Sequence, residues 1–95
     1  MKTTDQVLEQ RGTVYGDFYD GVSLEAVILE NIKDRYRNAH GKEIDPIYVI
    51  YLSKLAMKLS RLAVSPTHID SWTDIAGYAR LVELQLIKEQ NAKSQ

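Results

Sequence analysis

One uninterrupted stretch constrains the fold of this chain more than any other part of the sequence. Asp45 and Pro46 form a typical helix start, with aspartate as the N-cap and proline at the first helical position. No glycine or proline follows until the Ser65-Pro66 pair. The first half of the stretch looks β-like locally, but its length and its later leucines at helical spacing favour a helix. We therefore predict a helix from Pro46 to about Val64 that is apolar around most of its circumference and forms the most buried element.

The amino-terminal part predicts a short helix followed by a loop. A helix over 3–10 would be capped by Thr4 or Asp5, and Gly12 would be its carboxyl-terminal stop. Residues 11–21 contain three glycines and three aromatic residues without a steady period. We expect a structured loop there, because its aromatic rings would not be left wholly in water.

Two more helices complete an all-α fold with four helices. Ser23 is the expected N-cap of the second helix, which ends at His40 and the glycine after it. The fourth helix is expected to start near Asp70 or Ser71, where Ser71-x-x-Asp74 resembles a capping box. A glycine in the middle of that helix suggests close approach by another helix or by a ligand.

Length and composition describe one small domain. The 95 residues are 44% hydrophobic and 26% charged, which is close to a globular average. We divide the domain into an amino-terminal helix and loop (1–22), core helices (23–90) and a frayed polar tail (91–95). Four helices of this kind expose more apolar surface than a lone bundle covers, which predicts a homodimer or homotetramer.

Several classes of protein are disfavoured by the same composition. Cysteine is absent, so a disulfide scaffold, a thiolate metal site and a cysteine nucleophile are excluded. No signal peptide and no tract long enough for a bilayer is visible, so we expect a cytoplasmic protein without a membrane partner. Twelve basic and thirteen acidic residues give a net charge of −1, which argues against a long nucleic acid as partner.

The charges nevertheless form two strips that would face each other if the third and fourth helices packed antiparallel. The basic strip is Lys54, Lys58 and Arg61, and the second strip is Asp70, Asp74 and Tyr78. One interpretation is an interhelical ion-pair network that fixes the register of the helices. The other is a phosphate pocket, in which the cations bind phosphate oxygens and the carboxylates hold Mg²⁺. The pattern alone leaves both open.

Three further polar residues are weaker candidates. Glu30 and Asp34 lie one turn apart on the second helix, and they either add metal ligands or simply face solvent. His68 precedes the start of the fourth helix and either contacts a phosphate or base, or has a surface or capping role.

Three sequence blocks carry a family resemblance. The string from His68 to Leu81, with its Asp-Ser-Trp-x-Asp-Ile-Ala-Gly-Tyr run, resembles the signature of small bacteriophage and prophage proteins of unassigned function. Glu-Gln-Arg-Gly over 9–12 with Tyr-Gly-Asp-Phe over 15–18 resembles the amino-terminal block of that family, and Lys-x-x-Arg over 58–61 resembles its next block. The order and spacing of the three blocks are also similar. That family in turn resembles the MazG-like all-α nucleotide pyrophosphohydrolases.

The resemblance implies a dimerising helical bundle that converts a nucleoside triphosphate to the monophosphate and pyrophosphate with Mg²⁺. Asp74 matches an aspartate of the superfamily's Glu-x-x-Asp motif, whereas Ser71 stands in the place of its glutamate and the earlier Glu-x-x-Glu motif is missing. The implied catalytic residues are Asp74, Lys58 and Arg61. The implied metal ligands are Asp70, Asp74, Glu30 and Asp34. The implied nucleotide-binding residues are Tyr15, Gly16, Asp17, Phe18, Lys58, Arg61, His68, Ser71 and Tyr78.

Three functional hypotheses therefore remain. The first is Mg²⁺-dependent hydrolysis of a nucleoside triphosphate, in the host cytoplasm if the protein is phage-encoded. The second is a binding protein that sequesters a nucleotide, or another small phosphorylated ligand, and so counters host nucleotide signalling. The third is a structural helical oligomer with a residual pocket. The missing acidic residues favour the second hypothesis, and the resemblance favours the first.

Overall fold

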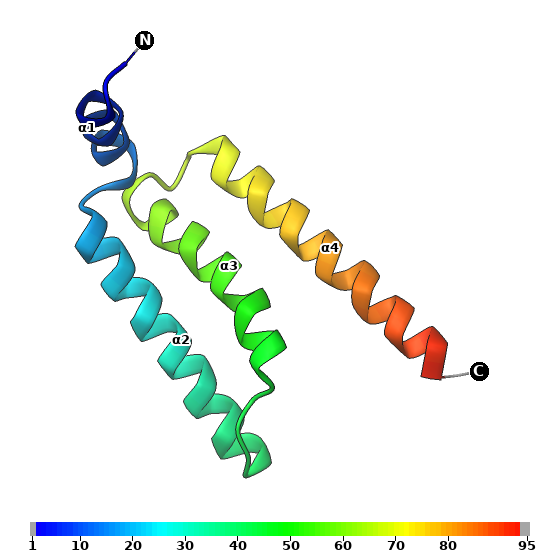
Figure 1. Ribbon diagram of the computed structural model, residues 1–95. Helices are drawn as coiled ribbons and strands as arrows, with labels where there is room; N and C mark the ends of the chain where they lie inside the picture. The colour runs from blue at the N-terminus through cyan, green and yellow to red at the C-terminus, as the bar shows by residue number, and fades with distance from the viewer. Residues whose placement is uncertain (1, 94–95) are drawn as a thin grey trace.

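The computed structural model describes residues 2–93, which form four α-helices and no strand. The helices are α1 (Thr4–Tyr15), α2 (Phe18–His40), α3 (Pro46–Val64) and α4 (Ile69–Lys93). Figure 1 shows α2 and α4 on the two sides of α3, each antiparallel to it, while α1 lies at the end where α2 begins. The predicted all-α class with four helices is confirmed.

The central position of α3 agrees with the sequence prediction. In the described residues α3 contacts each of the other helices, whereas α2 and α4 do not contact each other. Asp45 caps the helix by accepting a hydrogen bond from the amide of Ile47 at 2.9 Å, and Pro46 is the first helical residue. Four of the five buried residues within 2–93 lie on α3. The Asp-Pro start and the apolar sequence after it thus fix the element around which the others pack.

The four helices form an open layer within one chain. The radius of gyration is 16.6 Å, compared with about 12 Å for a compact chain of this length. Ala56 and Leu62 are the two apolar side chains that are buried within residues 2–93. A closed four-helix bundle would need a contact between α2 and α4, and the single chain does not provide one.

The prediction of a loop over residues 11–21 is wrong. Helix α1 continues through Gly12 to Tyr15, and α2 already begins at Phe18, so the link is only Gly16 and Asp17. Asp17 caps α2 by accepting from the amide of Asp20 at 3.0 Å, and the expected cap Ser23 lies inside the helix.

The remaining boundaries show smaller differences. Thr3, rather than Thr4 or Asp5, caps α1 in a reciprocal capping box with Gln6. Helix α4 continues to Lys93, beyond the expected end of the core helices at 90, and the rest of the predicted tail, 94–95, lies outside the described residues. Within 2–93, no helix combines the length and hydropathy that a bilayer span requires.

The link between α1 and α2 depends on a glycine. Gly16 has φ +82° and ψ −166°, a backbone conformation that only glycine adopts readily. A Cβ atom at this position would lie 2.8 Å from the Cγ2 atom of Val64 at the end of α3. Ser65 completes the contact, because its hydroxyl donates a hydrogen bond to the carbonyl of Val14. The sequence Tyr-Gly-Asp-Phe therefore forms a sharp link that holds α1 against the end of α3.

Candidate functional site

The two polar strips meet between α3 and α4 as an antiparallel packing requires. Lys58 Nζ lies 2.7 Å from a carboxylate oxygen of Asp74, and Lys54 Nζ lies 5.8 Å from the centre of the Tyr78 ring. The Lys58 side chain is only 8% exposed, while Asp74 is 48% exposed. This buried cation needs its partner, because an uncompensated charge in this position would be costly. At Lys58 the ion-pair interpretation of the strips is therefore confirmed.

Arg61 behaves differently, although it lies on the same strip. Its guanidinium carbon is 4.4 Å from the centre of the Tyr15 ring, which is a cation–π contact between α3 and the last residue of α1. Within the described residues no carboxylate lies within ion-pair distance of Arg61, and Asp70 of the opposing strip is exposed. The guanidinium donors of Arg61 consequently remain available to a ligand.

Tyr15 connects Arg61 to the start of α4. The His68 ring meets the Tyr15 ring edge-on, with centroids 5.5 Å apart and an interplanar angle of 89°. His68 Nδ1 and the Ser71 hydroxyl are 2.9 Å apart and share a hydrogen bond. Ser71 is buried, so its side chain supports His68 from inside the packing. The expected capping box of Ser71 and Asp74 is not formed, because α4 begins at Ile69, before the expected start at Asp70 or Ser71, and Ser71 lies inside the helix.

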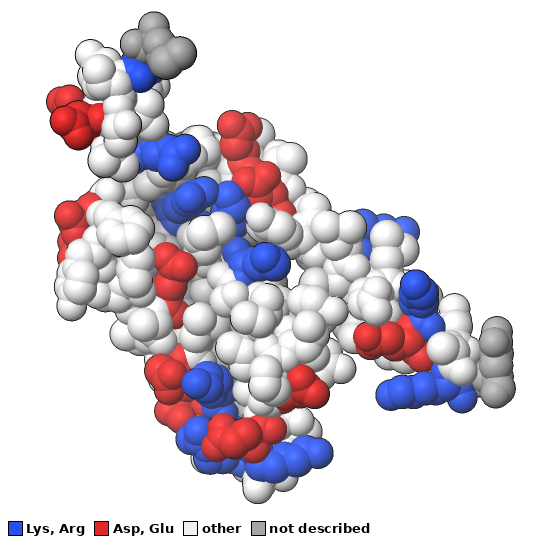
Figure 2. Space-filling model, in the orientation of Figure 1, with Lys and Arg blue, Asp and Glu red and all other residues white. Residues whose placement is uncertain are grey.

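We call this group the Arg61 cluster, and it comprises Tyr15, Lys58, Arg61, His68, Ser71 and Asp74. Three helices supply its members: the end of α1, the carboxyl-terminal half of α3 and the first turns of α4 together with the residue before them. In Figure 2, Lys and Arg side chains gather over the region where α1 and α3 meet, and Asp and Glu side chains lie beside them at the start of α4. The cluster is the place where the Tyr-Gly-Asp-Phe, Lys-x-x-Arg and His-Ile-Asp-Ser blocks converge.

Other predicted binding residues have local structural roles. Gly16 packs against Val64, and Asp17 caps α2. Phe18 is 84% exposed at the start of α2. A Cβ atom at Gly77 would meet nothing within 4 Å beyond the backbone of its own helix, so close approach of another helix of the same chain does not explain this glycine.

The four predicted metal ligands are not brought together in the single chain. Glu30 pairs with Lys33 at 3.3 Å, Asp34 pairs with Arg37 at 2.8 Å, and Asp74 pairs with Lys58. Across residues 2–93 no three histidine, aspartate or glutamate side chains are grouped closely enough to hold a metal ion. A Mg²⁺ ion at this site would therefore take its other oxygen ligands from a bound phosphate and from water, and the Mg²⁺ site stays a prediction.

Arg37 shows what an arginine looks like when its charge is satisfied. Its Nε atom lies 2.6 Å from one oxygen of Glu43, and a terminal nitrogen lies 3.0 Å from the other oxygen. These hydrogen bonds hold the pKa of Glu43 below its ordinary value and raise the pKa of Arg37. Arg37 also binds Asp34 on its own helix. Through Glu43 it fixes the end of α2 to the segment that leads into α3.

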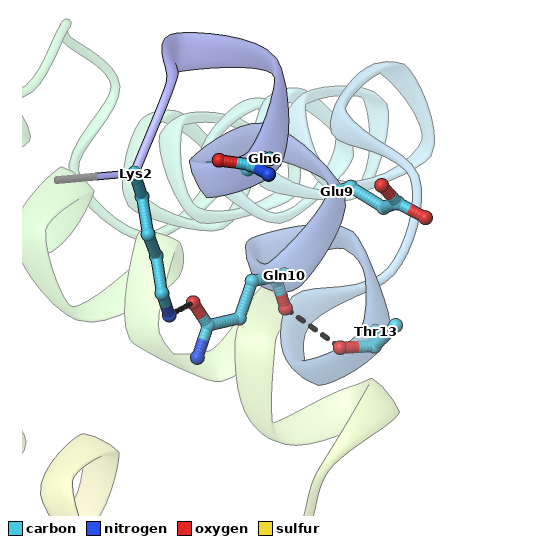
Figure 3. Close-up of a pocket in the computed structure, with 5 residues that line it drawn as sticks. All are labelled: Lys2, Gln6, Glu9, Gln10 and Thr13. Atoms are coloured by element: carbon cyan, nitrogen blue, oxygen red, sulfur yellow. Dashed lines mark hydrogen bonds between the residues drawn. The ribbon is translucent and has the colours of Figure 1, made fainter.

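A hollow lies along α1 and the residues before it. It measures about 420 Å³ and is lined by Lys2, Gln6, Glu9, Gln10 and Thr13. Figure 3 shows Lys2 bound to the Gln10 side chain and the Thr13 hydroxyl bound to the Gln10 carbonyl. None of the predicted site residues lines this hollow, and a single face of exposed polar side chains offers no converging set of charges.

The range that contains the Arg61 cluster matches a family model. Residues 1–85 match the family described as Domain of unknown function (DUF6378). The chain belongs to the DUF6378 family. The matched range includes the whole Arg61 cluster and most of α4. No curated protein and no solved structure matches the chain.

The DUF6378 match confirms the part of the resemblance that concerns a family of unassigned function. It does not support the further likeness to MazG-like enzymes, which stays a prediction together with the phage origin and the cytoplasmic location. The contact between Arg61 and Tyr15 was not predicted from the sequence. Its one signal was the presence of both residues in blocks that the family resemblance had already singled out.

Proposed function

We propose that this DUF6378 protein binds the phosphate groups of a nucleotide, or of a similar phosphorylated small molecule, at the Arg61 cluster. The observation that carries the proposal is the state of Arg61, which is held in place by the Tyr15 ring but has no carboxylate partner in the described chain. A guanidinium that is held against an aromatic ring and has available donors is suited to bidentate binding of phosphate oxygens.

Neighbouring groups support an anionic ligand at this position. His68 lies beside Tyr15, and its Nε2 atom is not engaged in the bond to Ser71. Helix α4 begins at Ile69, so the positive end of its dipole lies next to His68. Lys58 contributes positive charge from one turn earlier on α3, although part of that charge is neutralised by Asp74.

The geometry favours binding over hydrolysis. The acidic residues that would hold Mg²⁺ are separated or engaged in ion pairs, so no step of a metal-dependent reaction can be assigned to them. The hypothesis of a nucleotide-sequestering protein needs only the cations and the aromatic contact. These are the features that the Arg61 cluster has.

Equilibrium dialysis with ATP and with inorganic tripolyphosphate, each with and without Mg²⁺, tests the proposal. We expect saturable binding of both ligands and a rise in Kd of about tenfold or more in Arg61→Ala, since a charge-assisted hydrogen bond contributes roughly 1.5–3 kcal/mol. Arg37→Ala is the matched control, because it removes one arginine that lies outside the cluster, and it should leave Kd unchanged.

Two outcomes would contradict the proposal. Equal binding by the wild type and Arg61→Ala would show that the ligand binds away from Arg61. Absence of binding by the wild type would show that Arg61 only holds α1 on α3. The same mixtures are analysed for nucleoside monophosphate and pyrophosphate. Mg²⁺-dependent release that disappears in Asp74→Ala would replace the binding proposal by the hydrolase hypothesis.

A further inference from the structure

One face of α3 is apolar and only partly covered within the chain. Tyr48, Leu52, Leu55 and Leu59 follow one another at helical spacing and therefore share one side of the helix. Tyr48 is 39% exposed and Leu59 is 46% exposed. We call this side of α3 the leucine face.

A groove between α3 and α4 continues the leucine face. It measures about 400 Å³, and its lining includes Leu52 and Leu55 from α3 with Val82, Leu86 and Ile87 from α4. Glu83 is the charged member of the lining in the described chain. Such a surface offers a partner many apolar contacts and almost no charge by which to recognise a peptide or a headgroup.

The exposed area of the chain indicates how large the missing contact is. The 10.8 kDa chain exposes 7441 Å², whereas a compact monomer of that mass exposes roughly 5,500 Å². The excess of about 1,900 Å² per chain exceeds the area of about 800 Å² that each partner contributes to a standard interface. It lies within the roughly 1,000–2,500 Å² that each partner contributes in obligate dimers. With Ala56 and Leu62 as the buried apolar side chains of residues 2–93, the single chain lacks most of the core that a domain of this length needs.

We propose that the leucine face and the adjoining groove form the interface with a second copy of this chain. In a two-fold symmetric dimer the same surface patch of each copy contacts that of the other. An apolar patch with almost no charge can therefore bind its own copy without a separate complementary partner. Ile50 lies on the opposite side of α3, because it is nine residues, or two and a half turns, from Leu59. Arg61 lies on the same side as Ile50, because the eleven residues between them correspond to about three full turns. The dimer therefore covers the leucine face and leaves the side that carries Arg61 open.

A pair of matched substitutions on α3 tests this interface. Leu59→Glu places a charge on the leucine face, and Ile50→Glu places the same charge on the opposite side at a position of similar exposure, 53% against 46%. Size-exclusion chromatography with light scattering should give a wild-type particle of twice the chain mass. Ile50→Glu should keep that mass, and Leu59→Glu should lower the dimer affinity by at least a hundredfold.

Cysteine protection gives a second readout that does not depend on a disruptive charge. The chain has no cysteine, so Leu59→Cys and Ile50→Cys each introduce a single thiol. Maleimide modification of Leu59→Cys should slow at least tenfold when the protein concentration is raised into the dimer range, and modification of Ile50→Cys should keep its rate. This comparison decides the question if circular dichroism shows that Leu59→Glu does not fold.

Three results would overturn the proposal. A wild-type chain that stays monomeric at about 100 µM would show that the face has another occupant or none. Dissociation by Ile50→Glu with an intact Leu59→Glu dimer would place the interface on the side that carries Arg61. Equal maleimide rates at positions 50 and 59 in a dimeric protein would place it away from both.

Discussion

The two ends of the helical layer use arginine in opposite ways. At the end where α2 leads into α3, Arg37 is bound by Asp34 and by both carboxylate oxygens of Glu43. At the other end, Arg61 stacks on Tyr15 and has no carboxylate partner within the described residues. The first arrangement neutralises its charge and closes a turn. The second holds a cation in place while keeping its hydrogen-bond donors available, which is why we assign the binding function to that end.

The largest expected effect concerns the buried cation next to Arg61. Asp74→Asn removes the negative partner of Lys58, whose side chain is 8% exposed, and should lower the free energy of unfolding by about 2–3 kcal/mol. The figure stays below that of a fully buried pair because Asp74 itself is half exposed. Urea unfolding followed by circular dichroism measures the loss.

Asp70→Asn is the control for that substitution, because Asp70 lies one turn earlier on α4 and is exposed. It should change the free energy of unfolding little. If both variants unfold at the same urea concentration as the wild type, the ion pair with Asp74 does not stabilise the buried Lys58. That result would contradict the distinction between a paired Lys58 and an unpaired Arg61 on α3.

Alanine substitution of the glycine at each end should lower the free energy of unfolding, and the loss should be larger at the Arg61 end. Gly16→Ala combines an unfavourable φ of +82° with a Cβ atom 2.8 Å from Val64, and should cost about 2 kcal/mol. Gly41→Ala, at the end of α2, has φ +69° in the left-handed region and nothing within 4 Å, so about 1 kcal/mol is expected. Thermal unfolding of both variants gives the comparison. A Gly41→Ala variant that is less stable than Gly16→Ala would show that the link between α1 and α2 is not tightly held.

The smallest effect belongs to the exposed ion pair at the Arg37 end. Hydrogen bonding to Arg37 lowers the pKa of Glu43, so the stabilisation is complete above the ordinary glutamate pKa and is lost as the pH falls through the lowered value. Glu43→Gln should therefore lower the melting temperature by about 2 °C or less at pH 7. The wild type and the variant should converge at acid pH, and a difference that grows with acidification would contradict the assigned cause.

The central helix and the register of its neighbour could be predicted from sequence because each has a local signal. Asp45 and Pro46 define the start of α3, and the strips that contain Lys58 and Asp74 have the spacing of facing helices. The link at Gly16 could not be predicted in the same way. Gly12 looked like a helix stop, but a glycine inside a helix costs only about 1 kcal/mol, which the packing of α1 on α3 offsets.

The candidate site was predictable in its members but not in its arrangement. Tyr15 and Arg61 are 46 positions apart, and their contact exists only because α1 extends to Tyr15 and then turns sharply against the end of α3. The predicted metal ligands stay untested, but two of them have other partners in the single chain. Glu30 and Asp34 have metal-like spacing along the sequence, but each has a cation on its own helix as partner, Lys33 and Arg37.

The most direct test observes both arginines in one sample. Side-chain Nε–Hε resonances of Arg61 and Arg37, assigned with Arg61→Lys and Arg37→Lys variants, are followed by ¹⁵N-correlated NMR during titration with tripolyphosphate. We predict a saturable shift of the Arg61 resonance with a single Kd, while the Arg37 resonance stays at its position. An unmoved Arg61 resonance, or equal and unsaturable shifts of both arginines, would contradict the claim that the Arg61 cluster is a phosphate-binding site.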